Sequence, residues 1–302
     1  MKEIMKKLVA FGVLISMVLI TGCYYGPCMS GSGQIITETR DIAGFSEVIS
    51  GGDFEVYVNQ ADDYSVEVVA YENLLPIIET YISGNSLIIE TKNNSCYKSG
   101  QPIKVYVSLP ELELLELNGS GKLIAGVSEG EYLECGNNGS GYLAVDTVYM
   151  NYLYLSNSGS GLIEVERIYS DEVSLVLSGS GTIDMGEVSE PKEVTIKHSS
   201  SGNIRSIVVG GLNVNAILSG SGRIDLSGDV QKVDYTLNAS GRIDALDLIS
   251  YDARTTSSGS GTIFVWATEY LEATVSGSGD ILYRGEPQTN FRVTGSGSIR
   301  PY

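Results

Sequence analysis

The chain has 302 residues, of which 42% are hydrophobic, so it is long enough to bury a substantial core. Gly is frequent, with 36 residues, and Pro contributes only 7, which indicates many turns between short strands rather than disorder. The formal net charge of -18 argues against nucleic acid as a partner and against attachment to anionic lipid by charge, since both need a basic surface.

The first 22 residues have the form of an export signal. Three lysines precede an apolar run over residues 8–20, which is too short for a stable membrane span. The tetrapeptide ITGC, which ends at Cys23, resembles the lipobox of bacterial lipoproteins. We therefore expect Cys23 to be the lipidated amino terminus and the membrane to be a partner through this anchor. An ordinary secretory signal with a coincidental cysteine is the alternative.

Residues 23–33 form a short Gly/Ser-rich segment that we interpret as a tether. Cys28 and Cys96 lie in polar, loop-like contexts and could pair in an oxidising envelope. Cys135 falls at an apolar strand position, which is typical of a buried free thiol. None of these cysteines has the close spacing of a zinc site, and we expect no metal.

Residues 34–110 contain alternating strands such as FEVYV, YSVEVVAYE, LIIETK and IKVYVSLP. The segment NLLPIIETYI predicts one helical turn before a strand, because Pro76 argues against a longer helix. We interpret this region as an N-terminal β cap, or as irregular first coils, that covers the end of the repeats that follow.

From residue 111 to residue 302 the chain repeats a Ser-Gly corner every 18 to 21 residues. We expect the Gly to supply a positive φ, and the Ser to bond to its own corner or to the Ser one coil away, as a structural ladder and not as a nucleophile. The ten corner serines are Ser120, Ser140, Ser160, Ser180, Ser201, Ser221, Ser240, Ser260, Ser278 and Ser296.

Two residues after each corner Gly stands an aliphatic residue, from Leu123 to Ile299, and the flanking positions alternate with polar ones. This pattern predicts strands with one buried face, which must stack to bury it. The fold class we predict is all-β, a right-handed parallel β-helix of about ten coils, roughly 45 Å long. An antiparallel meander or sandwich is the alternative, but hairpins do not need one fixed phase in every repeat.

The combination of a lipobox, the segment RDIAGFSEVISGGDFEVYVNQADD and repeated NGSG or SGSG corners is similar to the auto-transporter adhesin, head GIN domain family. The resemblance covers about residues 38–300. It implies a right-handed parallel β-helix and an envelope lipoprotein, which we expect in the outer membrane of a Gram-negative bacterium. It supplies no catalytic motif.

Five tyrosines crowd into two adjacent repeats and suggest a surface for a glycan or an extracellular protein. A structural role, in which the rings merely cover the sheet, is the alternative. These residues are Tyr132, Tyr142, Tyr149, Tyr152 and Tyr154.

Charged residues three positions after the corner Gly could form a solvated ladder with ion pairs between coils. They could also belong to a polysaccharide-active enzyme or a glycan-binding accessory protein, which is the alternative function. The ladder comprises Glu164, Asp184, Arg205, Asp225 and Asp244, with Arg223 and Arg242 beside it.

Repeats of 18 to 21 residues leave almost no room for the long loops that would build a catalytic cleft. We therefore expect a non-catalytic envelope adhesin or binding scaffold, with no catalytic residue and no cofactor. His198, the single histidine, is expected to fill a partly buried site, and Asn137 and Asn157 to stack so that their amides bond to each other.

Overall fold

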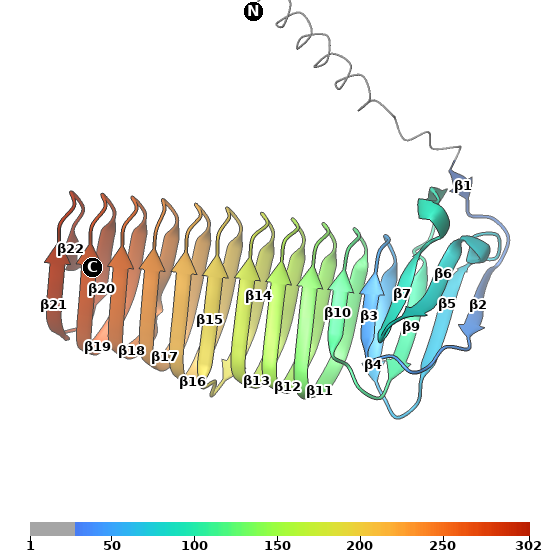
Figure 1. Cartoon of the computed structure of the whole chain (residues 1–302), viewed down its shortest axis with the longest axis horizontal. Coiled ribbons are helices and arrows are strands. Elements are labelled where there is room, and N and C mark those ends of the chain that lie inside the picture. Colours follow the sequence, from blue (N-terminus) through green and yellow to red (C-terminus); the bar gives the residue numbers. More distant parts are fainter. Residues whose placement is uncertain (1–27) are drawn as a thin grey trace, which may run out of the picture.

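The computed structural model describes residues 28–302, so the leader, Cys23 and the first part of the tether lie outside the described residues. Most strands form a parallel β-solenoid of about nine turns, which appears as a row of arrows in Figure 1. The described helical segments are the single turns η1 (Leu75–Ile77) and η2 (Lys92–Asn94). Within residues 28–302, no helix is long and apolar enough to span a bilayer.

The rod is built from strands that pair in parallel, with Tyr142 beside Leu162 and Leu162 beside Thr182. This pairing confirms the parallel β-helix and excludes an antiparallel meander for this part of the chain. The rod has about nine turns and not the predicted ten, because each complete turn runs from one corner to the next and ten corners bound nine such turns. The strands are β10 (Leu114–Leu117), β11 (Lys122–Asn137), β12 (Tyr142–Asn157), β13 (Leu162–Leu177), β14 (Thr182–Ser189), β15 (Glu193–His198), β16 (Asn203–Leu218), β17 (Arg223–Leu237), β18 (Arg242–Ser257), β19 (Thr262–Val275), β20 (Asp280–Arg284), β21 (Gln288–Val293) and β22 (Ile299–Pro301).

The aliphatic column that follows the corners forms the core of the rod. From Leu123 to Ile281 its members are 0% exposed, and Ile299 is half-buried because it lies in the last strand. Burial of each such side chain stabilises the fold by about 1.5–3 kcal/mol. The stacked column therefore supplies much of the force that holds successive turns together.

Each full turn bends twice, and the bends interrupt the alternation of buried and outward residues. In β12, Thr147 and Val148 are both buried, whereas Asn151 and Tyr152 are both at the surface. The turn thus has three narrow faces, which in β12 are residues 142–145, 147–150 and 152–157. We call these the first, second and third face, and equivalent residues of other turns share them through the register of the pairs.

The corner glycines are needed for close stacking, and the prediction that they supply a positive φ is wrong. Positive φ occurs at other described glycines, such as Gly84 and Gly210, and not at the corners. A Cβ on Gly241 would lie 2.6 Å from the carbonyl oxygen of Gly222 in the preceding turn. Real Cβ atoms do not approach an oxygen that closely, so the stacked backbone leaves room only for hydrogen.

Polar side chains fill the inside of several corners. The Asn157 amide donates to the carbonyl oxygens of Gly161 at 2.9 Å and Thr182 at 3.1 Å, and Asn137 makes the equivalent bonds. We had expected the two asparagine amides to bond to each other, but they donate to corner carbonyls instead. His198 occupies the same column, is 1% exposed, and has Nε2 2.8 Å from the Gly202 carbonyl oxygen.

Antiparallel strands cover the N-terminal end of the rod. β3 and β4 stack in parallel on β10 and β11, while β2 pairs antiparallel with β5, β5 with β9, and β6 with β7. The predicted helical turn is η1, which β6 follows directly. The bounds are β1 (Met29–Ser30), β2 (Ile35–Arg40), β3 (Glu47–Ser50), β4 (Glu55–Gln60), β5 (Ser65–Tyr71), β6 (Ile78–Ser83), β7 (Ser86–Thr91), β8 (Tyr97–Lys98) and β9 (Lys104–Leu109).

A disulfide joins Cys28 to Cys96, with Cα atoms 4.6 Å apart. It lies beside the short parallel pair of β1 and β8 and fixes the start of the described chain to this end of the rod. Cys135 is a buried free cysteine, as its apolar strand position predicted. At the opposite end, β21 is exposed along its whole length.

Candidate binding surfaces

The five tyrosines that we expected to share one surface lie on three faces of the rod. Tyr132, Tyr152 and Tyr154 lie on the third face of two adjacent turns. Tyr149 lies on the second face and Tyr142 on the first. The two bends in each turn separate them, so the structure brings three of the five together.

Tyr132, Tyr152 and Tyr154 form what we call the tyrosine cluster. The rings of Tyr132 and Tyr152 stack with centroids 5.6 Å apart and planes within 5°. The Tyr132 hydroxyl donates to Glu134 at 2.8 Å, and Glu172 lies beside Tyr152 in the next turn. The cluster therefore combines stacked aromatic rings with adjacent carboxylates.

Two tyrosines of the cluster, Tyr132 and Tyr154, have raised pKa values and stay neutral at physiological pH. Burial first, and then the hydrogen bond to Glu134, raises the pKa of Tyr132. Burial, followed by the nearby Glu134 charge, also raises the pKa of Tyr154. A phenol that keeps its proton remains a hydrogen-bond donor at the edge of an apolar ring, which suits a contact surface that is partly dry.

A second aromatic pair lies on the second face. Tyr149 stacks on Tyr169 with centroids 4.7 Å apart and planes within 6°, and the two residues are 44% and 40% exposed. Reasoning from the sequence missed Tyr169, although both tyrosines stand eight residues after their corner glycines, Gly141 and Gly161. That shared column was the signal that could have found the pair.

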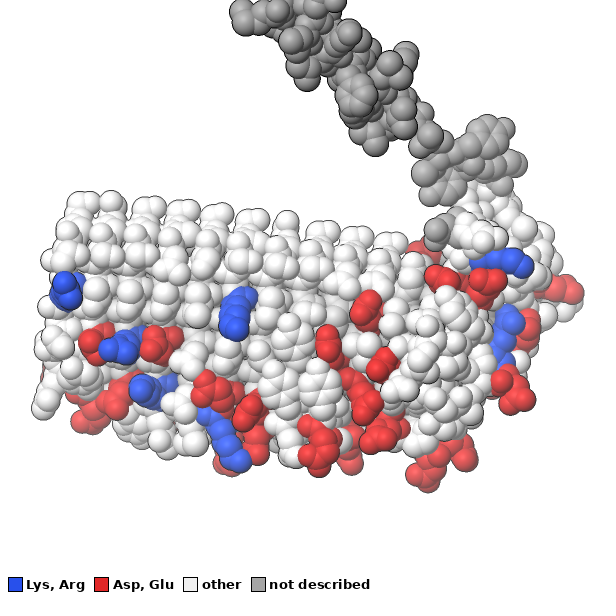
Figure 2. Space-filling model, in the orientation of Figure 1, with Lys and Arg blue, Asp and Glu red and all other residues white. Residues whose placement is uncertain are grey.

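The ten corner serines form an exposed ridge along the rod, which we call the serine ridge. In Figure 2 it is the uncharged band along the upper edge. Among the described residues, Ser296 donates to Ser278 across one turn at 3.0 Å. At several other corners, the side-chain hydrogen bonds between turns join residues two positions before the corner Ser, as from Asn138 to Asn118 at 3.0 Å and from Ser158 to Asn138 at 2.6 Å.

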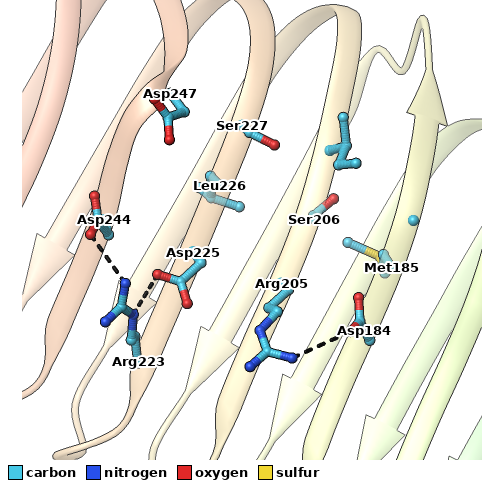
Figure 3. Close-up of a pocket in the computed structure, with 12 residues that line it drawn as sticks. Asp184, Met185, Arg205, Ser206, Arg223, Asp225, Leu226, Ser227, Asp244 and Asp247 are labelled. Atoms are coloured by element: carbon cyan, nitrogen blue, oxygen red, sulfur yellow. Dashed lines mark hydrogen bonds and ion pairs between the residues drawn. The ribbon is translucent and has the colours of Figure 1, made fainter.

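A shallow groove, which we call the axial groove, runs along the first face beside the serine ridge. It consists of two hollows of about 540 and about 410 Å³ that share Asp184 and Arg205. The larger hollow is lined by Ser120, Gly121, Lys122, Ser140, Gly141, Tyr142, Ser160, Gly161, Leu162, Thr182, Asp184 and Arg205. The smaller hollow, drawn in Figure 3, is lined by Asp184, Met185, Gly186, Arg205, Ser206, Ile207, Arg223, Asp225, Leu226, Ser227, Asp244 and Asp247.

Most of the predicted charge ladder lines the axial groove, namely Asp184, Arg205, Arg223, Asp225 and Asp244, and these residues form ion pairs, whereas Glu164 and Arg242 do not line it. Arg223 contacts Asp225 in its own strand and Asp244 in the next turn, the latter at 3.2 Å. Arg205 lies 3.5 Å from Asp184 (Figure 3). These side chains are partly exposed to solvent, so each pair adds only about 0–1 kcal/mol to stability. Their main consequence is to hold planar polar groups in fixed orientations.

Tyr142 joins the groove at its other end. Its hydroxyl donates to Glu164 in the next turn at 2.5 Å. Burial first, and then this hydrogen bond, raises the pKa of Tyr142 to about 12. The ring therefore lies against the first face as a neutral aromatic group beside Leu162, its partner in register.

The groove carboxylates do not form a metal centre. Within the described part of the chain, no three His, Cys, Asp or Glu side chains are grouped in a way that could hold a metal ion. Asp184, Asp225 and Asp244 contact arginines instead. The arrangement can donate and accept hydrogen bonds to a polar ligand that lies along the rod.

These observations define a parallel β-solenoid protein that displays polar and aromatic surfaces on narrow faces. The sequence profile of the family described as "Putative auto-transporter adhesin, head GIN domain" matches residues 44–220 and 206–287. The chain belongs to this family. Membership supports an adhesin-like, non-catalytic role at the cell surface or envelope.

Solved structures share this fold. A protein of Parabacteroides distasonis described as a "putative lipid binding protein" is 25% identical, with 91% of this chain and 99% of that chain covered and a TM-score of 0.55. A "putative adhesin" from the same organism is 20% identical over 91% of this chain and 99% of that chain, with a TM-score of 0.51. No curated protein matches the chain.

Proposed function

We propose that this protein is a lipid-anchored adhesin of the cell envelope that binds a protein partner through the tyrosine cluster. The anchor is Cys23, which the leader and the ITGC tetrapeptide predict. The disulfide between Cys28 and Cys96 supports this arrangement, because it ties the chain that follows the anchor to the covered end of the rod. The rod would then project its repeats away from the membrane.

The stacked rings of Tyr132 and Tyr152 are the observation that carries the proposal. Tyrosine has few rotatable bonds, so it supplies contact area at low entropic cost, and it is enriched among the residues that dominate protein interfaces. Carboxylates of Glu134 and Glu172 adjoin the cluster, and the whole chain carries a net charge of -18. The partner surface that fits best is therefore one with basic residues around an apolar centre.

The test is binding of the purified full-length protein to an array of extracellular proteins, with a glycan array in parallel. The double variant Tyr132→Ala/Tyr152→Ala should lose at least about tenfold in affinity for its protein target, since truncated hot-spot residues cost 2 kcal/mol or more. Tyr251→Ala is the matched control, because Tyr251 is 59% exposed and lies several turns away. It should bind like the wild type.

Circular dichroism should show the same melting temperature for all three proteins, because the altered side chains lie at the surface. Equal protein binding by the double variant and the wild type would refute the role of the cluster. If the double variant lost binding to a glycan and not to a protein, the partner of the cluster would be a glycan.

A further inference from the structure

We propose that the axial groove on the first face is a binding site for a linear, uncharged oligosaccharide. The groove lies on a different face from the tyrosine cluster, so this inference does not rest on the proposed adhesive function. The proposal does not depend on family membership. It depends on the side chains that the register of the turns brings into one line.

The shape of the groove fits an extended polymer. Its lining residues come from successive turns, from Lys122 in β11 to Asp247 in β18, so it runs along the rod and not across it. Successive turns are spaced by about 4.8 Å, so the groove spans roughly 30 Å. One sugar ring of an extended β-linked glycan advances by a similar distance, and each turn can therefore meet one ring.

The end of the groove next to the serine ridge offers hydroxyl groups and an aromatic ring. Ser120, Ser140 and Ser160 are exposed along its edge, and glycines between them and the sheet leave backbone without side chains. Tyr142 and Leu162 lie side by side on its floor. An aromatic ring flanked by small polar groups can pack against the apolar face of a sugar while its hydroxyls find donors and acceptors.

The other end of the groove offers planar charged groups that are already oriented. A guanidinium has five N–H donors, and Arg223 uses only Nε and Nη2 in its contacts with Asp225 and Asp244. It can therefore donate to a ligand hydroxyl without leaving its partners. The carboxylates of Asp225 and Asp247 face the same hollow and can accept from neighbouring hydroxyls (Figure 3).

The charge of the groove selects against an ionic polymer. Its lining holds Lys122, Arg205 and Arg223 against Asp184, Asp225, Asp244 and Asp247, which nearly cancel. The chain as a whole carries -18. A polyanion would meet this negative charge without a continuous row of basic residues to offset it. A polycation would find an excess of only one acidic residue within the groove.

An extended peptide fits the groove less well than a glycan. A peptide that adds to a sheet needs a strand edge with free N–H and C=O groups. Each strand from β11 to β18 already has parallel neighbours on both sides, so the first face has no free edge over the groove. Recognition there must come from side chains, which matches the many hydroxyls of a sugar chain.

The experiment uses isothermal titration calorimetry of the purified full-length protein with cellohexaose and chitohexaose. A hexaose of polygalacturonate serves as the anionic comparison. We expect one of the two neutral hexaoses to bind, and Tyr142→Ala and Arg223→Ala each to weaken that binding by about tenfold or more. Tyr142→Phe keeps the ring and should bind within about threefold of the wild type.

The controls separate this site from the tyrosine cluster and from misfolding. Tyr132→Ala/Tyr152→Ala and Tyr251→Ala should leave oligosaccharide binding unchanged, and every variant should keep the circular dichroism spectrum and the cooperative melting of a folded rod, with Tyr142→Ala and Tyr142→Phe melting below the wild type because they lose the hydrogen bond to Glu164. Failure of both neutral hexaoses to bind at millimolar concentration would overturn the proposal. So would tighter binding of the anionic hexaose, or binding that neither Tyr142→Ala nor Arg223→Ala weakens.

Discussion

Substitution of a corner glycine by alanine tests the stacking that holds the rod together. A Cβ on Gly241 would lie 2.6 Å from the Gly222 carbonyl oxygen and 2.7 Å from Cδ2 of Leu218. Ordinary contacts begin near 3.4 Å, so the corner would have to move by almost 1 Å. Forcing extra volume into a packed site costs about 1–3 kcal/mol, and the loss of glycine flexibility in the unfolded chain returns about 0.4–1 kcal/mol.

We therefore expect Gly241→Ala to lower the free energy of unfolding by about 1–2 kcal/mol. The assay is urea denaturation, followed by circular dichroism and by the fluorescence of Trp266, the single tryptophan. Gly126→Ala is the matched control, because its nearest neighbour, Asn59 Oδ1, lies at 3.9 Å and its φ is not positive. That variant should be as stable as the wild type or slightly more so. Equal stability of the Gly241 and Gly126 variants would refute the close-stacking account of the corners.

Three further predictions concern buried or partly buried groups. Asn157→Ala should lower the free energy of unfolding by about 2–3 kcal/mol in the same assay, because two carbonyls of the corner lose their donor. Tyr142 should ionise near pH 12, above the usual pKa of 10. Its contribution to stability is therefore complete below pH 10 and is lost between pH 10 and 12, and phenolate absorbance of the wild type compared with Tyr142→Phe measures this. Cys135 should resist iodoacetamide until urea unfolds the chain, since it is fully buried and burial raises its pKa, as mass spectrometry of the alkylated peptides would show.

The architecture could be predicted from sequence because the repeat constrains it at every turn. Each of the ten units has an aliphatic residue two positions after its Ser-Gly corner. Parallel stacking of the units explains this fixed spacing, and most other β folds do not require it. The reason for the glycine was missed, because a contact between Gly241 and Gly222 exists only once the turns are stacked. A positive φ is a property of one residue, whereas the close contact that excludes a Cβ arises between two neighbouring turns.

The surfaces were harder to predict than the core. An alternating pattern shows which residues point outward, but it does not locate the bends near Thr147 and Asn151 that send Tyr142, Tyr149 and Tyr152 to different faces. The sequence did predict the charged column, and the register confirmed that Arg223 meets Asp244 across one turn. The groove itself could not be foreseen, because it combines that column with the serine ridge and with the irregular pairing around Gly186.

The parallel stacking of turns twenty residues apart can be tested most directly by engineered cross-links between corner serines. In the rod, Ser140 and Ser160 lie one turn apart, with Cα atoms about 4.8 Å from each other, which is within the range of a disulfide. Ser140 and Ser180 lie about 10 Å apart, which is too far. Mild oxidation of the native protein should therefore link Ser140→Cys to Ser160→Cys and leave the pair Ser140→Cys/Ser180→Cys unlinked, as peptide mapping by mass spectrometry would detect. Cross-linking of the 140/180 pair without the 140/160 pair would contradict the stacked solenoid and the surfaces that depend on it.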